Sequence, residues 1–268
     1  MQTWKLTIAY DGRTLCGWQV QPGVRTVQAE LESVVSKLFG GGRICVHGSG
    51  RTDSGVHALA QVASFRAQKE RSPEQVIMAL NAMLPPDISC LSAEMVEPAF
   101  HARFSATGKT YRYLIQESAV RSPLWQGLVW RVRGPVDWAL VDQALLAYRG
   151  TWDFSAFQAP SMPKRSPVRT IWRAEREPMT GPHGVVQALT FEGPGFLRYQ
   201  VRILVGTAME VGLGRRPVAS IPDLLARGPE GARDEAGRTA PPDGLYLVSV
   251  GYEPRERGVL GQGLPPSS

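Results

Sequence analysis

The chain has 268 residues, of which 43% are hydrophobic and 20% charged, a composition typical of folded globular proteins and unlike that of disordered or fibrous chains. Its formal net charge of +6 favours a polyanionic partner such as nucleic acid, although a moderately basic enzyme without such a partner would have the same balance. No apolar run approaches the roughly 18 residues of a membrane span, and the first residues carry no basic-then-apolar signal, so we expect a cytoplasmic protein with no membrane partner.

The first half alternates strand-like and helix-like patterns. Thr26 can cap its first helix, and Ser72-Pro73-Glu74-Gln75 has the residues of a capping box with proline in the first turn. The expected elements are a strand at 3–11, a helix at 26–39, strands at 43–48 and 58–66, a helix at 72–84 and a strand at 88–96. The order is βαββαβ, that of a ferredoxin-like unit.

The same order recurs in the second half. The expected elements are a strand at 107–117, a helix at 137–148, strands at 168–177 and 185–193, a helix at 197–212 and a strand at 245–252, with an extra helix at 220–228 that Ser220 can cap. We therefore predict an α+β fold of two ferredoxin-like (βαββαβ) halves, residues 1–105 and 106–268, with a ligand cleft between them.

The three cysteines, Cys16, Cys45 and Cys90, are odd in number and widely spaced. No CxxC or HxxxH spacing occurs, so the sequence supports neither a disulfide framework nor a zinc site, and we expect no bound metal. His47 lies two residues from Cys45, a spacing that a packed or surface pair explains better than a metal site.

The stretch 48–58 reads GSGRTDSGVHA and joins two expected strands. The dinucleotide pattern GxGxxG fails because Asp53 occupies the place of the third glycine. The Walker pattern fails because Val56-His57 replaces the required Lys-Ser/Thr. We therefore expect no nucleotide cofactor.

Two interpretations of this loop remain open. A TDSG turn in which Asp53 caps its own turn is the plain one, but the loop is longer than a hairpin needs and holds a charged pair, Arg51 and Asp53. An aspartate is ionised at pH 7, and a nearby arginine lowers its pKa further, so it can attack or accept a proton without an activating base. We expect the glycines to let Asp53 and Arg51 approach a ligand closely.

Two further stretches place aromatic and basic side chains at regular spacing. KTYRYLI at 109–115 alternates so that Lys109, Tyr111 and Tyr113 share a face, either for stacking on a base or as sheet core. In FLRYQVRILVG at 196–206, Arg198 and Arg202 are four residues apart on one helical face. Arg202 sits in an apolar stretch, so either a carboxylate or ligand meets it or its head reaches water.

Together these stretches closely resemble the tRNA pseudouridine synthase A (TruA) family. The matching pieces span nearly the whole chain in order and are YDGRTLCGWQVQP (10–22), TVQAELE (26–32), GSGRTDSGVHALAQV (48–62), FHARFSATGKTYRYLI (100–115), FLRYQVRILVG (196–206) and TAPPDGLYLVSV (239–250). Ser54 departs from the alanine usual in the family, a change of one small residue for another. The segment 207–238 matches least well, and no roles are carried over there.

The resemblance implies an isomerase that converts uridine to pseudouridine in the anticodon stem-loop of tRNA, at conventional positions 38, 39 and 40. It implies no cofactor, tRNA as partner and a homodimer. By this likeness Asp53 is the catalytic carboxylate. Whether it attacks C1′, attacks C6 or acts as a base is left open. By the same likeness the substrate-binding residues are Arg51, Tyr111, Arg202 and Leu245. Arg51 helps to displace the base and holds the phosphate side, and Tyr111 packs on the base. Arg202 pairs with Asp53, and Leu245, with Leu247 as the alternative, lines the pocket.

Two other functions compete with this prediction. An RNA-binding module without catalysis is the first, but its usual RNP1 pattern is absent from the sequence. A carboxylate-pair hydrolase is the second, and it needs an acidic partner for Asp53 that only the fold could supply, from Glu192 or Asp153.

Overall fold

The structure, a computed structural model, describes residues 1–40, 42–159, 166–181 and 184–253. Its strands are β1 (Gln2–Tyr10), β2 (His47–Gly48), β3 (His57–Ala67), β4 (Ile88–Val96), β5 (Gly108–Glu117), β6 (Trp130–Val132), β7 (Gly150–Asp153), β8 (Val168–Ile171), β9 (Arg173–Gly181), β10 (Gly184–Gly193) and β11 (Leu245–Gly251). Its helices are α1 (Val27–Phe39), α2 (Pro73–Met83), α3 (Trp138–Ala147), α4 (Gln200–Gly212) and α5 (Ser220–Arg227).

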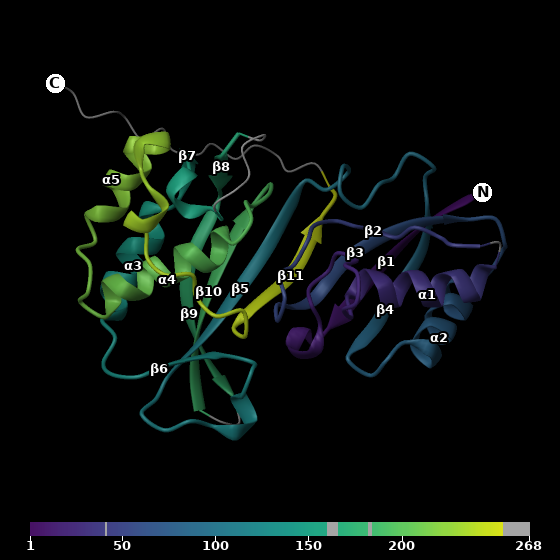
Figure 1. Ribbon diagram of the computed structural model, residues 1–268, viewed down its shortest axis with the longest axis horizontal. Helices are drawn as coiled ribbons and strands as arrows, with labels where there is room; N and C mark the ends of the chain where they lie inside the picture. Colours follow the sequence, from purple (N-terminus) through teal and green to yellow (C-terminus); the bar gives the residue numbers. More distant parts are fainter. Residues whose placement is uncertain (41, 160–165, 182–183, 254–268) are drawn as a thin grey trace.

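One mixed sheet of nine strands runs through the molecule, so the fold is α+β (Figure 1). Seven strands follow one path in the order β4-β1-β3-β11-β5-β10-β9, while β2 pairs with β3 and β6 pairs with β5. The last strand, β11, lies parallel to β3 and antiparallel to β5. The C-terminal end of the described chain therefore joins the strands of the first half to those of the second.

The helices lie toward the two ends of this sheet. Figure 1 shows α1 and α2 near β1 and β4, and α3, α4 and α5 at the end with β9 and β10. The caps predicted for α1 and α2 are confirmed, because Thr26 Oγ1 accepts from the Ala29 N–H at 3.4 Å and Ser72 and Gln75 form the capping box. None of the helices in the described ranges is long and apolar enough to span a bilayer.

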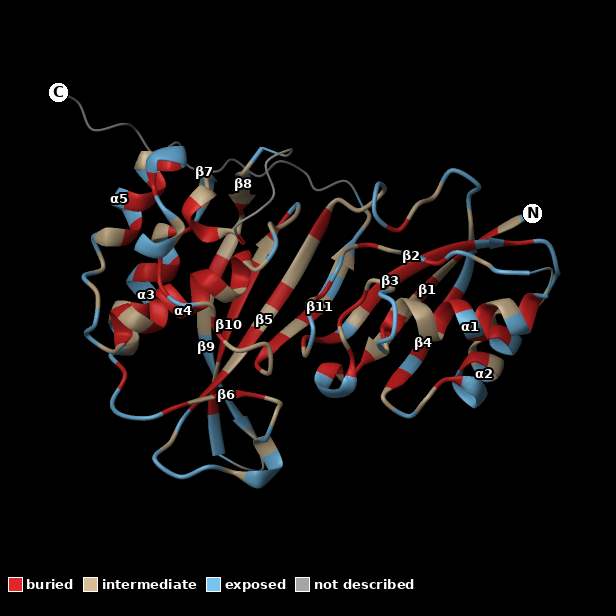
Figure 2. Ribbon diagram, viewed as in Figure 1, coloured by how far each residue is buried: buried red, intermediate tan, exposed pale blue. Residues whose placement is uncertain are grey.

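Buried residues concentrate on the strands in the middle of the sheet and on the inner sides of the helices (Figure 2). The largest fully buried side chains come from both halves of the chain, with Trp4 and Phe65 on β1 and β3 and Tyr113 and Phe191 on β5 and β10. Trp4 and Phe65 are cross-strand partners, and their rings stack at a centroid distance of 6.4 Å. The core is thus continuous from the first half into the second.

The strand expected at 43–48 is wrong for most of its length, since only His47 and Gly48 form β2. The backbone before them bonds to side chains of α1 instead of to a neighbouring strand. The Ile44 N–H donates to Ser36 Oγ at 2.8 Å, and the Val46 N–H donates to Glu32 Oε1 at 3.2 Å. Side-chain partners on a helix satisfy these amides, so the segment needs no ladder.

Three other boundaries differ from the prediction. The strand expected at 168–177 is divided at Trp172 into β8, which pairs with β7 in a separate sheet, and β9, which pairs with β10. The helix expected from 197 begins at Gln200. Ser220 does not cap α5, because its hydroxyl donates to the Pro217 carbonyl at 2.8 Å and Ala219 is the N-cap residue.

Candidate active site

The loop that joins β2 to β3 is fixed at its start by a buried network. The Ser49 N–H donates to the Val62 carbonyl at 2.8 Å and the Ser49 hydroxyl to Gln61 Oε1 at 2.6 Å. The Gln61 amide returns a bond to the Gly50 carbonyl at 3.0 Å. Ser49 and Gln61 are fully buried, so the network holds the loop in one conformation before it reaches Asp53.

The glycines of this loop permit close packing against neighbouring segments. A Cβ at Gly48 would overlap the indole of Trp18, and a Cβ at Gly55 would lie 2.8 Å from the ring of Pro242. Gly55 also has a φ of +79°, which L side chains rarely adopt. These contacts to the protein account for two of the glycines that the sequence suggested were there for a ligand.

Asp53 meets Arg202 at the far end of the loop. An oxygen of Asp53, Oδ2, lies 3.3 Å from Nη1 of Arg202, and the two side chains are 22% and 14% exposed. The Arg202 Nε donates to the Ala240 carbonyl at 2.8 Å, so the guanidinium is held from two sides. The pair connects the loop between β2 and β3 to helix α4, which is far from it in the sequence.

Burial raises the pKa of the Asp53 carboxyl above its ordinary value, and the guanidinium groups of Arg202 and Arg198 partly offset that rise. The sequence predicted the opposite direction, because it revealed the arginines but not the burial. The charges close enough to shift this pKa are both cationic, and neither Glu192 nor Asp153 is among them. Glu192 pairs with Arg173 at 3.3 Å instead, so the described residues give no support to a carboxylate pair.

Tyr111 lies on β5 in the middle of the sheet and is 8% exposed. Its ring contacts Phe196 edge to face, with centroids 5.2 Å apart. Burial raises its pKa, with smaller contributions from Tyr10 and from Asp53, so the phenol lies near the carboxylate. The structure therefore brings Tyr111, Asp53 and Arg202 into one neighbourhood.

The two candidate leucines on β11 both face the tyrosines of β5. Leu247 is the register partner of Tyr111, and Leu245 is the register partner of Tyr113. Cross-strand partners share a face of the sheet. Both leucines are buried, at 5% for Leu245 and 0% for Leu247, and the register places Leu247 beside the tyrosine nearer Asp53.

Arg51 is exposed, and its guanidinium makes no ion pair with the residues that the structure describes. It is therefore not part of the Asp53–Arg202 ion pair, although it is only two residues from Asp53 in the chain.

Two residues of this neighbourhood were not selected from sequence. Tyr199 precedes α4 with a φ of 64°, the one positive φ outside glycine in the described ranges. Its ring lies 5.1 Å from the Arg202 guanidinium carbon and 4.8 Å from that of Arg198. A non-glycine residue held in this region costs of order 1–3 kcal/mol and is typical of functional sites. The only feature of the sequence that could have pointed to Tyr199 is its place between Arg198 and Arg202.

Lys109 is the second of these residues. Its ammonium donates to the Ser49 carbonyl at 2.7 Å, and burial, followed by the charge of Arg103, lowers its pKa to about 8. It thus ties the base of the Asp53 loop to the start of β5. The alternation of KTYRYLI placed Lys109 on the face of Tyr111 but gave no partner for it.

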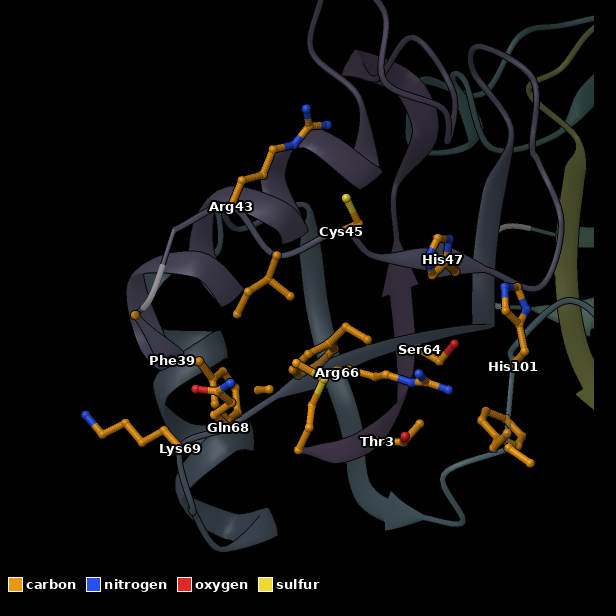
Figure 3. Close-up of a pocket in the computed structure, with 17 residues that line it drawn as sticks. Thr3, Phe39, Arg43, Cys45, His47, Ser64, Arg66, Gln68, Lys69 and His101 are labelled. Carbon is orange, nitrogen blue, oxygen red and sulfur yellow. The ribbon is translucent and has the colours of Figure 1, made fainter.

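Two cavities lie away from the carboxylate. The larger, about 960 Å³, lies beside β2 and the end of β3, and Figure 3 shows His47 next to His101 in its lining. The smaller, about 220 Å³, is lined by Trp130 and Asp243, among others. Asp53 lines neither of them.

Comparison with known proteins identifies relatives over almost the whole chain. A family model described as tRNA pseudouridine synthase matches residues 6–105 and 144–253. The tRNA pseudouridine synthase A of Geobacillus sp. (strain WCH70) is 41% identical over 251 residues, which cover 93% of this chain and 98% of the relative. That of Maridesulfovibrio salexigens is 41% identical, covering 94% and 91%, and that of Streptococcus gordonii is 38% identical, covering 94% and 100%.

Proposed function

The chain belongs to the tRNA pseudouridine synthase A family, and on this premise we propose that it converts uridine to pseudouridine at positions 38, 39 and 40 of the tRNA anticodon stem-loop, with Asp53 as the catalytic carboxylate. The enzyme is an isomerase. The single observation that carries the assignment to Asp53 is its ion pair with Arg202, 3.3 Å long and largely removed from water.

The reaction exchanges one bond of the uracil ring for another. The bond between N1 and C1′ breaks, the ring turns, and a bond forms between C5 and C1′. The hydrogen on C5 leaves as a proton and N1 gains one, so the substrate and the product have the same composition. An ionised carboxylate is suited to this chemistry because it serves as nucleophile or base without a second group to deprotonate it.

The remaining side chains provide binding and charge balance in this proposal. Arg202 keeps Asp53 ionised against the effect of burial, and the Tyr111 ring packs on the extruded uracil. Leu245, or Leu247 as its alternative, forms the apolar wall beside the tyrosines. Arg51, exposed and without a carboxylate partner among the described residues, takes the place of the displaced base or contacts a phosphate.

Extruding a base from a stem costs a few kcal/mol. Stacking on an aromatic ring returns about 1–3 kcal/mol per base, and contacts between guanidinium groups and phosphates offset the rest. The net charge of +6 supports such contacts. Binding should therefore weaken steeply as salt concentration rises, because each phosphate contact releases counterions.

We also propose that the molecule consists of two ferredoxin-like halves, 1–105 and 106–268, with the RNA bound in a cleft between them. Each half has strands in the same spatial order, β4-β1-β3-β2 in the first and β11-β5-β10-β9 in the second. The pairing of Asp53 from the first half with Arg202 from the second supports a site at this junction. A homodimer is part of the proposal by family likeness and predicts twice the chain mass in solution.

The proposal is tested by release of tritium from tRNA labelled at C5 of uridine. We expect tritium release from tRNA with uridine at positions 38, 39 and 40. The amount released should fall each time cytidine replaces one of these uridines. Undiminished release after all three are replaced would show that the enzyme acts elsewhere in the tRNA. No release from any tRNA would contradict the proposed reaction.

A further inference from the structure

The turn at residues 101–105 presents an aromatic ring to solvent near β2, the strand that leads into the Asp53 loop. Phe104 is 78% exposed, the most exposed large apolar side chain in the described part of the chain. Single exposed apolar residues are ordinary on protein surfaces. What distinguishes this one is the set of hydrogen bonds that anchor its turn and the guanidinium of Arg103 beside its ring.

The backbone of the turn is anchored on both sides. The Ala102 N–H donates to Ser64 Oγ at 3.0 Å, and the Tyr252 hydroxyl donates to the Ala102 carbonyl at 2.7 Å. Within the turn, the Ser105 N–H donates to the His101 carbonyl at 2.9 Å. Ala102 is fully buried. The ring of Phe104 is therefore held outward by a fixed backbone, so little conformational entropy would be lost when a ligand covers it.

A second set of contacts orients the ring itself. The His101 and Phe104 rings lie 4.5 Å apart, and Nδ1 of His101 accepts from the N–H groups of Arg103 and Phe104 at 3.1 and 3.4 Å. Because Nδ1 is an acceptor, His101 is neutral with its proton on Nε2. The guanidinium carbon of Arg103 lies 5.7 Å from the centre of the Phe104 ring. The Phe104 ring thus packs against His101 on one part of its surface, while most of it faces solvent next to Arg103.

The position of the turn links it to the proposed catalytic loop. His101 and His47 lie side by side in Figure 3, with ring centroids 5.0 Å apart, and His47 opens β2, which leads directly into the loop. On the other side, Lys109 connects β5 to the same loop through the Ser49 carbonyl. Arg103 is close enough to lower the pKa of Lys109.

We propose that Phe104 is a second stacking site, which takes an unpaired base of the RNA while the target uridine occupies the site at Asp53. An exposed aromatic face next to an arginine suits any nucleobase, since every base has a π face and a neighbouring phosphate pairs with the guanidinium. The inference rests on the proposed function, because it needs an RNA bound at the Asp53 loop. It adds a base contact at a residue to which no role has been given.

The substitution Phe104→Leu removes the aromatic face and keeps an apolar side chain of similar size. We expect it to weaken the binding of a tRNA transcript about tenfold, equivalent to about 1.4 kcal/mol, and to raise KM similarly while kcat at saturation stays within about twofold. Phe104→Trp retains the face and should bind at least as well as the wild type. Val120→Ala, at a side chain that is 75% exposed, is the control for loss of exposed apolar surface and should change nothing.

A direct readout uses stem-loop RNAs with 2-aminopurine in place of each unpaired loop base in turn. One position should lose fluorescence on binding to the wild type and to Phe104→Trp, and should keep it with Phe104→Leu. Equal affinity of wild type and Phe104→Leu, or no position that depends on Phe104, would overturn the inference. A change in the solution mass of Phe104→Leu would also overturn it, by showing a protein interface. If the wild type releases no tritium, the proposed function fails, whereas release with unchanged Phe104→Leu binding contradicts only this inference.

Discussion

The carboxylate of Asp53 is mostly buried, and its pKa results from two opposing effects. Burial raises the pKa, and the guanidinium groups of Arg202 and Arg198 lower it. The family resemblance predicted the partner, whereas the apolar stretch around Arg202 alone left open whether a carboxylate, a ligand or water meets its guanidinium. The sequence could not predict the direction of the pKa shift, because burial depends on segments such as 238–243 that pack around the loop only in the folded chain.

Removing the guanidinium of Arg202 should raise the pKa of Asp53 further. Activity that needs the ionised carboxylate is lost as pH falls through this pKa, so the acid limb of kcat/KM should move to higher pH in Arg202→Gln. At neutral pH we expect kcat/KM to fall by about a hundredfold. Arg202→Lys keeps the charge and should shift the limb less. The pH dependence of tritium release measures both, and an acid limb unmoved in Arg202→Gln would show that Asp53 does not control it.

Helices with strong periodicity and recognisable caps were predicted to within a few residues, as α1 and α2 show. The segment 43–46 was not, because Glu32 and Ser36 of α1 satisfy its amides and no local pattern reveals that. The break at Trp172 was missed for a similar reason. Its N–H donates to the Glu192 carbonyl at 2.8 Å, a partner on another strand. Elements defined by local periodicity were therefore predictable, and those defined by distant partners were not.

Helix α4 carries Arg202 and packs closely against the segment that follows α5. A Cβ at Gly206 would overlap the Arg238 carbonyl and lie 3.2 Å from the Ala240 nitrogen. Gly206→Ala should therefore move the segment whose Ala240 carbonyl accepts from Arg202. We expect a loss of about 1–3 kcal/mol in the free energy of unfolding and a lower kcat.

The matched control for this substitution is Gly195→Ala. No atom lies within 4 Å of a Cβ built at Gly195, and its φ is not in the left-handed region. It should retain both stability and kcat. Urea unfolding and tritium release measure the two quantities. Equal behaviour of Gly206→Ala and Gly195→Ala would contradict the packing of α4 described here.

At the scale of the whole molecule, the two ends of the chain meet around His57. This residue is 2% exposed, and its ring stacks on Tyr246 of β11 at 4.6 Å. Nδ1 accepts from the Gly12 N–H at 3.1 Å, so Nε2 carries the proton and faces the carbonyls of Gly127 and Asp243 at 3.0 and 3.1 Å. No local pattern in the sequence predicts this junction, because its partners are far apart in the chain.

Burial lowers the pKa of His57 below 6.5, its ordinary value. The unfolded chain therefore binds this proton at a higher pH than the folded protein does. The stability contributed by neutral His57 is present above pH 6.5 and is lost as pH falls toward the lowered folded pKa, by at most about 1.4 kcal/mol per pH unit.

Urea unfolding at a series of pH values measures this loss. The free energy of unfolding should decline below pH 6.5 in the wild type and decline less steeply in His57→Gln. The same slope in His57→Gln and wild type would show that another group causes the decline.

The most direct test of the catalytic assignment is Asp53→Asn, measured by tritium release and by tRNA binding on the same preparation. The amide keeps the shape of the side chain but cannot act as nucleophile or base, so we predict a loss of at least about a thousandfold in kcat, with tRNA still bound. Asp142→Asn, which breaks the ion pair with Arg176 on the exposed side of α3, should leave kcat unchanged. Turnover by Asp53→Asn at the rate of the wild type would contradict the role of this carboxylate.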